Sequence, residues 1–206
     1  MKKVFGLFFA MVFVASQIAR AQETEGYKIG DIVDDFSLIN VDGTTVSLSD
    51  YSDQEGVIVV FTCNTCPVAV ANEDRINALD KKYKPLGFPV VAVNPNDPGV
   101  VPKESAGEMK KRAADKGFTF PYLLDPDHLT TLKFGASRTP HAFIVANTDA
   151  GMKLQYIGAI DDDSEGGEPT NKYVENAIAA IKAGQTPTPS FTKAVGCGIK
   201  WKKAVF

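Results

Sequence analysis

Short apolar runs alternate with amphipathic segments along most of the chain. Two runs of β-branched and aromatic residues, at 57–61 and 88–93, have the continuous hydrophobicity of strands buried on both faces. Apolar residues at helical spacing follow at 68–83, and a Lys-, Glu- and Ala-rich segment at 102–116 is predicted to be an exposed helix. Because buried strands alternate with helices, the pattern predicts an α/β fold in which helices flank a central mixed sheet.

Shorter elements surround this core. Two apolar runs at 36–39 and 44–48 flank Asp42-Gly43, a pair that favours the tight turn of a β-hairpin. From Pro187 onward the chain becomes irregular, and no linker long enough to divide domains is visible. The other predicted elements are a strand at 120–124, a short helix at 127–134, strands at 142–146 and 153–157, and an amphipathic helix at 171–182.

The N-terminal segment has the pattern of a secretory signal peptide. Two lysines precede an apolar run from Val4 to Ala15, which at twelve residues is too short to span a bilayer as a helix. Ala19-Arg20-Ala21 provides a small-x-small cleavage site, and an uncleaved membrane anchor is the alternative. Cleavage would leave residues 22–206 as a single exported domain, which in a bacterium means the periplasm, with no stable membrane insertion.

Composition narrows the classes of function. The formal net charge is −3, and because residues 1–21 hold three basic residues and no acidic ones, the exported chain would carry −6. This acidic balance lacks the basic footprint of nucleic-acid-binding proteins, so we expect no nucleic-acid partner. Three cysteines are too few for a disulfide-stapled scaffold, and their number is odd.

Cys63 and Cys66 form a Cys-x-x-Cys pair between a predicted buried strand and a predicted helix. A helix N-terminus stabilises a thiolate, and a thiolate is the nucleophile in thiol–disulfide exchange and in peroxide reduction. Pro67 fits the first helical turn, and Thr65 or Asn64 is the expected N-cap. The pattern predicts redox chemistry in which the dithiol or disulfide is itself the redox centre, without a further cofactor.

Two other interpretations of the pair stay open. One is an inert structural disulfide, and the other is a zinc half-site, which needs two further ligands. Cys197, His128 and His141 are the remaining soft ligands and do not form a second spaced pair, so we expect no metal. His141 is either a group that tunes the thiolate or a packing residue, and His128 shows no partner in the sequence.

With these motifs, the chain resembles the thioredoxin-fold superfamily, and more narrowly the redoxin group of thioredoxin-like and peroxiredoxin-like proteins that includes alkyl hydroperoxide reductase and thiol-specific antioxidant. The resemblance covers about residues 29–182 and is strongest for a peroxiredoxin-like subgroup with a CxxCP motif. It rests on the early hairpin and on four segments: Cys63-Asn64-Thr65-Cys66-Pro67, Arg138-Thr139-Pro140-His141, Tyr156-Ile157-Gly158 before Asp161-Asp162, and Gly196-Cys197-Gly198-Ile199-Lys200-Trp201.

The resemblance implies a thioredoxin fold with an N-terminal β-hairpin and an insertion before the cis-proline strand. It identifies Pro140 as the cis-proline and Thr139 as the residue whose backbone faces an extended substrate, whereas a trans proline at a strand start is the alternative. Arg138 lies near the place of the peroxiredoxin arginine and is a candidate for polarising a peroxide. Cys66 takes the place of the peroxide-reacting cysteine, and Cys63 that of a Thr or Ser.

This departure favours dithiol exchange, so the leading hypothesis is an exported thiol–disulfide oxidoreductase with Cys63 and Cys66 as the catalytic pair. Thioredoxins favour Cys63 as the nucleophile and peroxiredoxins favour Cys66, and the choice stays open. The alternatives are a thiol peroxidase with antioxidant activity and a non-catalytic or metallochaperone domain. The implied partners are protein thiols or disulfides, or a peroxide, and an unidentified electron donor.

Cys197 lies far beyond the pair in the sequence, and three interpretations apply to it. It is a resolving cysteine for the pair, a cysteine that pairs with another chain, or a buried free cysteine among apolar neighbours such as Ile199 and Trp201. We prefer the last, because free cysteines are among the most often buried residues.

Overall fold

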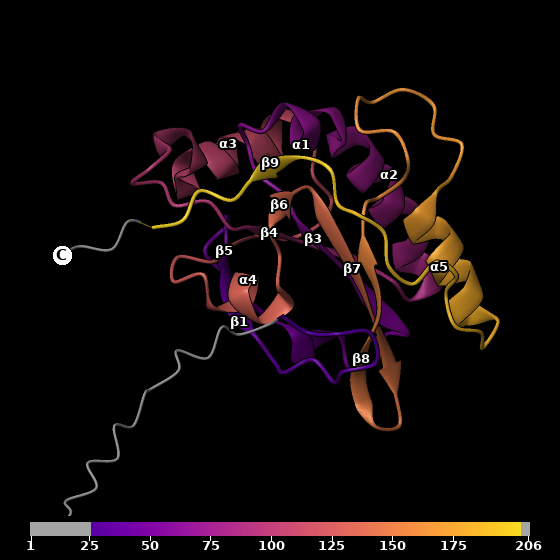
Figure 1. Cartoon of the computed structure of the whole chain (residues 1–206). Coiled ribbons are helices and arrows are strands. Elements are labelled where there is room, and N and C mark those ends of the chain that lie inside the picture. Colours follow the sequence, from indigo (N-terminus) through magenta and orange to yellow (C-terminus); the bar gives the residue numbers. More distant parts are fainter. Residues whose placement is uncertain (1–25, 203–206) are drawn as a thin grey trace, which may run out of the picture.

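The Val- and Ile-rich runs pair into a central sheet. The computed structural model describes residues 26–202, so the predicted signal peptide lies outside the described residues. A seven-stranded sheet has the order β2-β1-β5-β4-β3-β7-β8, and a separate two-stranded ladder joins β6 to β9 (Figure 1). The strands are β1 Ser37–Asn40, β2 Thr45–Ser47, β3 Gly56–Phe61, β4 Val90–Asn94, β5 Tyr122–Leu124, β6 Arg138–Thr139, β7 His141–Thr148, β8 Gly151–Gly158 and β9 Cys197–Gly198.

The sheet is mixed, as predicted. β3 runs parallel to β4 and antiparallel to β7, and β4 runs parallel to β5. The predicted hairpin around Asp42-Gly43 is β1–β2, which extends the sheet through β5. The helices are α1 Pro67–Ala71, α2 Glu73–Tyr83, α3 Ala106–Asp115, α4 Leu129–Phe134 and α5 Tyr173–Lys182, with 3-10 turns η1 Leu48–Tyr51, η2 Lys84–Leu86 and η3 Pro102–Glu104.

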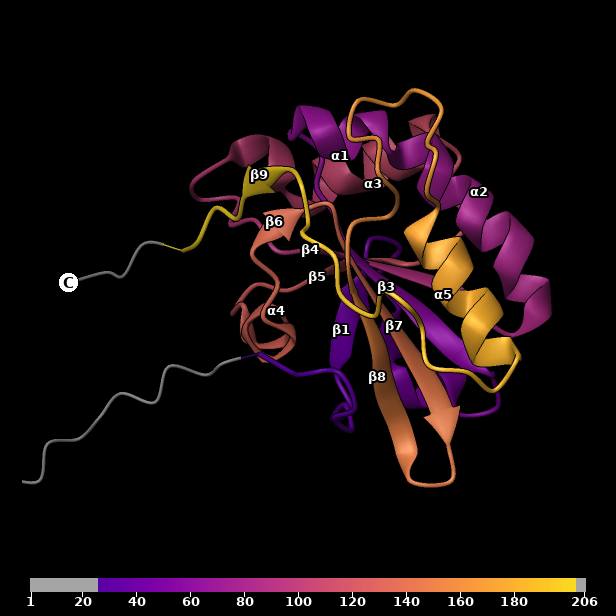
Figure 2. The same cartoon turned by 45° about the vertical axis from the view of Figure 1, so that its right-hand side comes forward.

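Both faces of β3 are covered, which explains its uninterrupted hydrophobicity. Ile58 and Val60 pack in one core with residues of α2, α3 and α5, whereas Val57, Val59 and Phe61 pack in a second core that includes Phe134 of α4. Figure 2 shows α2 and α5 together on one side of the sheet and α4 on the other. This two-sided burial fixes the end of β3, from which the Cys63–Cys66 loop departs.

Two predicted helices are interrupted. The helix expected at 68–83 breaks at Asn72, which ends α1 and begins α2 and whose side chain donates to the Val68 carbonyl at 2.8 Å. The segment predicted as an exposed helix at 102–116 begins with the η3 turn, and its Glu104 is buried. That prediction of exposure is wrong for Glu104, because the carboxylate is drawn inward by backbone and amide donors described below.

The segment beyond Pro187 leads from α5 to β9, which lies beside α1 and β6 (Figure 1). It is irregular, as predicted, except for β9 and for a bridge in which the Ile157 amide donates to the Ser190 carbonyl at 3.0 Å. We call residues 190–202 the tail. Among residues 26–202, no helix is both long and apolar enough to cross a membrane.

Candidate active site

The Cys63–Cys66 loop connects the buried end of β3 to the start of α1. Cys66 is itself the N-cap of α1, with an extended backbone (φ −72°, ψ 121°), and Pro67 occupies the first helical turn as predicted. The expectation that Thr65 or Asn64 caps the helix is wrong. The cap position places the Cys66 sulfur beside the free N–H groups of the first turn, which favour the charged thiolate.

A buried carboxylate holds the backbone of this loop. Glu104 Oε2 accepts the Asn64 N–H at 2.8 Å, and Oε1 accepts the Thr65 N–H at 3.0 Å. The side chain of Asn94, at the end of β4, donates to Oε2 at 2.9 Å. Because Glu104 is 1% exposed, several donors replace the water that its charge has lost. Nothing in the Lys- and Glu-rich segment around it distinguishes this residue in the sequence.

The side chain of Asn64 adds a second anchor. Its Nδ2 donates to the Lys103 carbonyl at 2.8 Å, and its Oδ1 accepts the Tyr122 hydroxyl at 3.1 Å. The loop is therefore tied to η3 and to β5, two elements that lie far from it in the sequence. Sequence reasoning did not single out Glu104, Asn94 or Tyr122 as parts of the site.

Both sulfurs of the pair contact Thr139. Cys63 Sγ lies 3.1 Å from the Thr139 hydroxyl, and Cys66 Sγ lies 3.1 Å from the Thr139 carbonyl oxygen. The Thr139–Pro140 peptide bond is cis, as the resemblance implied. Residues 63, 66, 139 and 140, which the sequence marked as one site, are therefore together in the structure.

Cys197 also lies at this site. Its backbone N–H donates to Cys66 Sγ at 3.2 Å, and its side chain packs against the small cluster of Cys63, Cys66 and Ala69. Cys197 is a free cysteine, as in the preferred interpretation, but it is only half-buried and it packs against the cysteine pair. The register that pairs β9 with β6 places it opposite Thr139, and this long-range pairing cannot be read from the sequence.

The three thiols differ in acidity. Hydrogen bonds from the Cys63 thiol, from Cys197 and from the Ala69 N–H lower the pKa of Cys66 well below its ordinary value, against the opposing effect of burial. The pKa of Cys63 is raised, because its proton is held by Cys66 and because burial and the Glu104 charge disfavour a second anion. The pKa of Cys197 is also raised, chiefly because its thiol proton is held by Cys66.

Cys66 is therefore the most acidic of the three thiols, and its neighbours are proton donors to its thiolate form. The Thr139 carbonyl accepts a hydrogen bond from Cys66 only in the thiol form. Ionisation ends that bond. The hydrogen bonds that Cys63 and Cys197 donate to the sulfur then stabilise the anion. This asymmetry favours Cys66 as the nucleophile, the point that the sequence left open.

The other predicted residues have different surroundings. Arg138 donates to the Gly196 carbonyl at 2.9 Å and so binds the tail. Burial lowers the pKa of His141 to about 4, and its ring packs 4.5 Å from that of Phe143, so it is a neutral packing residue at pH 7. His128 accepts the Lys202 N–H at 3.0 Å through Nε2.

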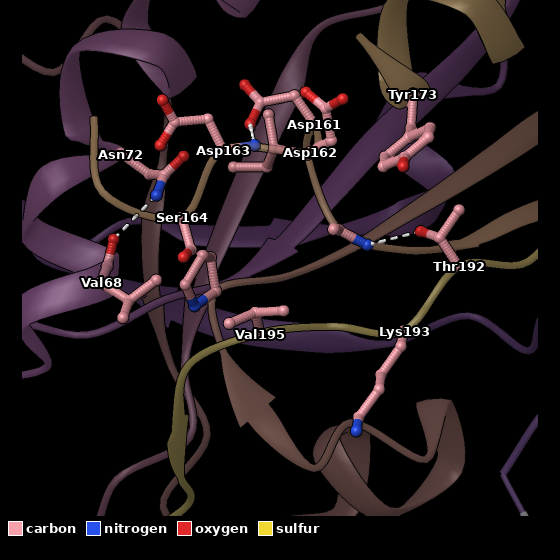
Figure 3. A pocket seen from close by; sticks show the side chains of 13 residues that line it. Val68, Asn72, Asp161, Asp162, Asp163, Ser164, Tyr173, Thr192, Lys193 and Val195 are labelled. Carbon is pink, nitrogen blue, oxygen red and sulfur yellow. Dashed lines mark hydrogen bonds between the residues drawn. The ribbon is translucent and has the colours of Figure 1, made fainter. Parts of the chain in front are cut away.

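A cleft of about 280 Å³ lies on the far side of Pro140. The acidic loop 161–164 forms one wall, and tail residues Thr192, Lys193 and Val195 form another (Figure 3). Asp161 in this loop is paired with Arg75 at 3.0 Å. None of the described cysteines lines the cleft, and residues 26–202 contain no group of three or more His, Cys, Asp or Glu side chains placed to hold a metal ion.

The cysteine pair and Thr139–Pro140 lie in a region of the chain that is similar to a known family. The AhpC/TSA family profile matches residues 29–157, more than half of the chain. The chain belongs to the AhpC/TSA family. The resemblance drawn from the cysteine pair and the Thr-Pro motif is thereby confirmed. No curated protein matches the sequence.

Solved structures extend the comparison beyond the AhpC/TSA region. An uncharacterized conserved protein from Geobacillus kaustophilus is 30% identical, with a TM-score of 0.80 over 88% of this chain and 96% of that one. A hypothetical protein from Sinorhizobium meliloti 1021 is 27% identical, with a TM-score of 0.80 over 87% and 97%. A putative thiol:disulfide interchange protein DsbE from Chlorobium tepidum is 28% identical, with a TM-score of 0.53 over 63% and 84%. The exposed lipoprotein thioredoxin Etrx1 from Streptococcus pneumoniae strain TIGR4, 23% identical with a TM-score of 0.52 over 65% of this chain and 94% of that one, confirms the thioredoxin-type fold.

Proposed function

We propose that this AhpC/TSA family member is a thiol–disulfide oxidoreductase in which Cys66 attacks and Cys63 resolves. The observation that carries the proposal is the pair of buried sulfurs that both lie against Thr139, in which the pKa of Cys66 is lowered and that of Cys63 is raised. A nucleophile and a proton-bearing thiol in contact are what dithiol exchange needs. The likeness to a putative thiol:disulfide interchange protein supports the same class of substrate.

The reaction follows from the two protonation states. The Cys66 thiolate attacks one sulfur of a substrate disulfide and forms a mixed disulfide, while the substrate bond breaks and its second sulfur leaves with the bonding electrons and takes a proton from water. Cys63 then loses its proton to solvent and attacks the Cys66 sulfur. The Cys63–Cys66 disulfide forms, the second substrate thiol is released, and two electrons have passed to the substrate. An external dithiol returns the protein to its reduced state.

We further propose that the protein acts after export, on disulfides of the periplasm. The support is the signal-peptide pattern of residues 1–21. Disulfides persist in that compartment, so substrates of this class are present there. N-terminal sequencing of the protein recovered from a periplasmic extract tests this, and a chain that begins at Met1 would contradict it.

Reduction of insulin in the presence of dithiothreitol tests the activity. We expect Cys66→Ser to lower the rate to that of dithiothreitol alone and Cys63→Ser to lower it as well. Without dithiothreitol, the Cys63→Ser, Cys197→Ser double variant is expected to stop after one attack on insulin and to accumulate a mixed disulfide visible by mass spectrometry. Circular dichroism of the variants controls for folding. Rates equal to that of the unaltered protein would overturn the proposal.

A thiol peroxidase is the second candidate, favoured by the lowered pKa of Cys66 at a helix start. In that reaction the thiolate attacks a peroxide oxygen, the O–O bond breaks, and Cys63 or Cys197 converts the sulfenate to a disulfide with loss of water. Arg138, the candidate for polarising the peroxide, is bound to Gly196 instead. We therefore expect stopped-flow oxidation of Cys66 by hydrogen peroxide to be no faster than that of a free thiol.

A further inference from the structure

The tail occupies the backbone edge beside the two reactive sulfurs. β9 pairs antiparallel with β6, with Thr139 opposite Cys197 and Arg138 opposite Gly198. Both views show β9 lying directly along β6 (Figures 1 and 2). An extended polypeptide that adds to a strand edge uses the main-chain hydrogen-bonding groups of that edge, and one edge pairs with one strand at a time. The same edge therefore cannot hold β9 and a substrate strand together.

We propose that β9 is an internal pseudosubstrate strand, which a protein disulfide must displace before it can react with Cys66. The proposal rests on the proposed function and adds a class of ligand to it: an extended polypeptide segment that carries a disulfide. A small disulfide needs no strand pairing, so it reaches Cys66 with the tail partly in place. The resting protein therefore discriminates between small and polymeric disulfides.

The contacts of the tail fit a segment that can leave. Beyond β9, the Lys200 N–H donates to Asn96 Oδ1 at 2.8 Å, the Asp97 N–H donates to the Lys200 carbonyl at 2.8 Å, and Ile199 is buried. Trp201 and Val195, by contrast, are exposed. Few apolar contacts and many hydrogen bonds at the surface are typical of segments that open locally without global unfolding.

Departure of the tail would also enlarge the neighbouring cleft. Thr192, Lys193 and Val195 wall the cavity beside Pro140 on the tail side (Figure 3). Without that wall, the Thr139 edge and the cleft become one continuous surface. The residues on either side of a substrate cysteine could then bind to this surface. Exposure of the Cys66 sulfur alone would leave no space for them.

Gly196 gives a direct way to separate the strands. A Cβ at this position would lie 2.0 Å from the Thr139 carbonyl oxygen and 2.7 Å from its carbon, so no side chain fits while β9 is paired. A Cβ at Gly198 would meet no atom within 4 Å. Gly196→Ala, directly before β9, should therefore expel this strand, and Gly198→Ala, two residues further along, is the matched control that keeps it.

The experiment compares two substrates in the full chain. Rates with insulin and with hydroxyethyl disulfide are measured for the unaltered protein and for both variants, and hydrogen exchange reports whether amides 196–200 have lost protection. We expect Gly196→Ala to raise the rate with insulin about fivefold or more and to change the rate with hydroxyethyl disulfide by less than about twofold. A tail that is released without any gain in the insulin rate would overturn the proposal.

A second measurement does not depend on Gly196. In the Cys63→Ser, Cys197→Ser double variant, Cys66 is trapped as a mixed disulfide with an extended peptide that contains one cysteine, or with glutathione as the small control. We expect amides 196–200 to lose protection with the peptide and to keep more of it with glutathione. Equal protection in the two adducts would overturn the proposal. If Cys66 forms neither adduct, the proposed function itself has failed.

Discussion

Two regions meet at Cys66, and they are held in different ways. The Cys63–Cys66 loop is fixed from inside by the buried Glu104 carboxylate, which accepts the N–H groups of Asn64 and Thr65. The tail is fixed from outside, largely by backbone hydrogen bonds and by the two small or medium-sized buried side chains of Ala194 and Ile199. The nucleophile is therefore positioned by contacts of the protein interior, whereas access to it depends, in our proposal, on a segment held at the surface.

The largest expected changes in stability and in the insulin rate come from a substitution that weakens the support of the Cys63–Cys66 loop. Glu104→Gln replaces a carboxylate that accepts several hydrogen bonds by an amide whose NH₂ must face at least one donor. We expect the free energy of unfolding to fall by about 2–4 kcal/mol and the insulin rate to fall about tenfold, because buried charge-assisted bonds are lost and the loop shifts. Urea denaturation measures the first effect and the insulin assay the second.

Glu168→Gln is the matched control, because Glu168 is exposed in the loop before α5. Surface substitutions of this kind change stability by less than about 0.5 kcal/mol. A Glu104→Gln protein as stable as this control would show that the carboxylate does not hold the loop.

The acidity of Cys66 is expected to respond to both regions, and more strongly to the loop. The Cys63 thiol is the largest contributor to the lowered pKa of Cys66, and the Cys197 side chain contributes less. Cys63→Ala should therefore raise the pH at which the Cys66 thiolate forms, and Cys197→Ala should raise it by a smaller amount. Thiolate absorbance near 240 nm, followed from acid to alkaline pH, measures both midpoints.

The direction in which the titration midpoint of Cys66 moves depends on which form of the thiol the donors stabilise. Loss of a donor to an anion favours the protonated thiol, so the midpoint moves up and less thiolate is present at neutral pH. A midpoint that is unchanged in Cys63→Ala, or a larger shift in Cys197→Ala than in Cys63→Ala, would reverse the proposed division between loop and tail.

The smallest expected effect comes from loosening the tail at its surface end. Trp201 is 42% exposed, and its ring centre lies 5.1 Å from that of His128. We expect Trp201→Ala to raise the insulin rate by less than about twofold and to destabilise the protein by less than about 1 kcal/mol, since the ring is only partly buried. Leu86→Ala, which truncates an equally exposed apolar residue in η2, is the control and should leave the insulin rate unchanged.

Much of the fold was predictable from local patterns. The runs at 57–61 and 88–93 became β3 and β4, and Asp42-Gly43 became the turn of the β1–β2 hairpin. The break at Asn72 was missed, because apolar spacing continues through it and the side-chain bond to Val68 leaves no mark on the pattern. The spacing of apolar residues indicates where a helix or strand lies, but it does not show where a helix breaks.

The sequence by itself determined the chemistry of the site: a Cys-x-x-Cys pair at a strand–helix junction, a Thr-Pro pair before a strand, and the family to which these motifs belong. Only the tertiary structure decided which thiol has the lowered pKa, what holds the loop and where the third cysteine lies. The physical reason is that the deciding contacts join residues that lie far apart in the sequence. Asn64 and Glu104 are 40 residues apart, and Cys66 and Cys197 are 131 apart, so their contacts depend on strand pairing and on burial of charge. Local patterns carry no record of either.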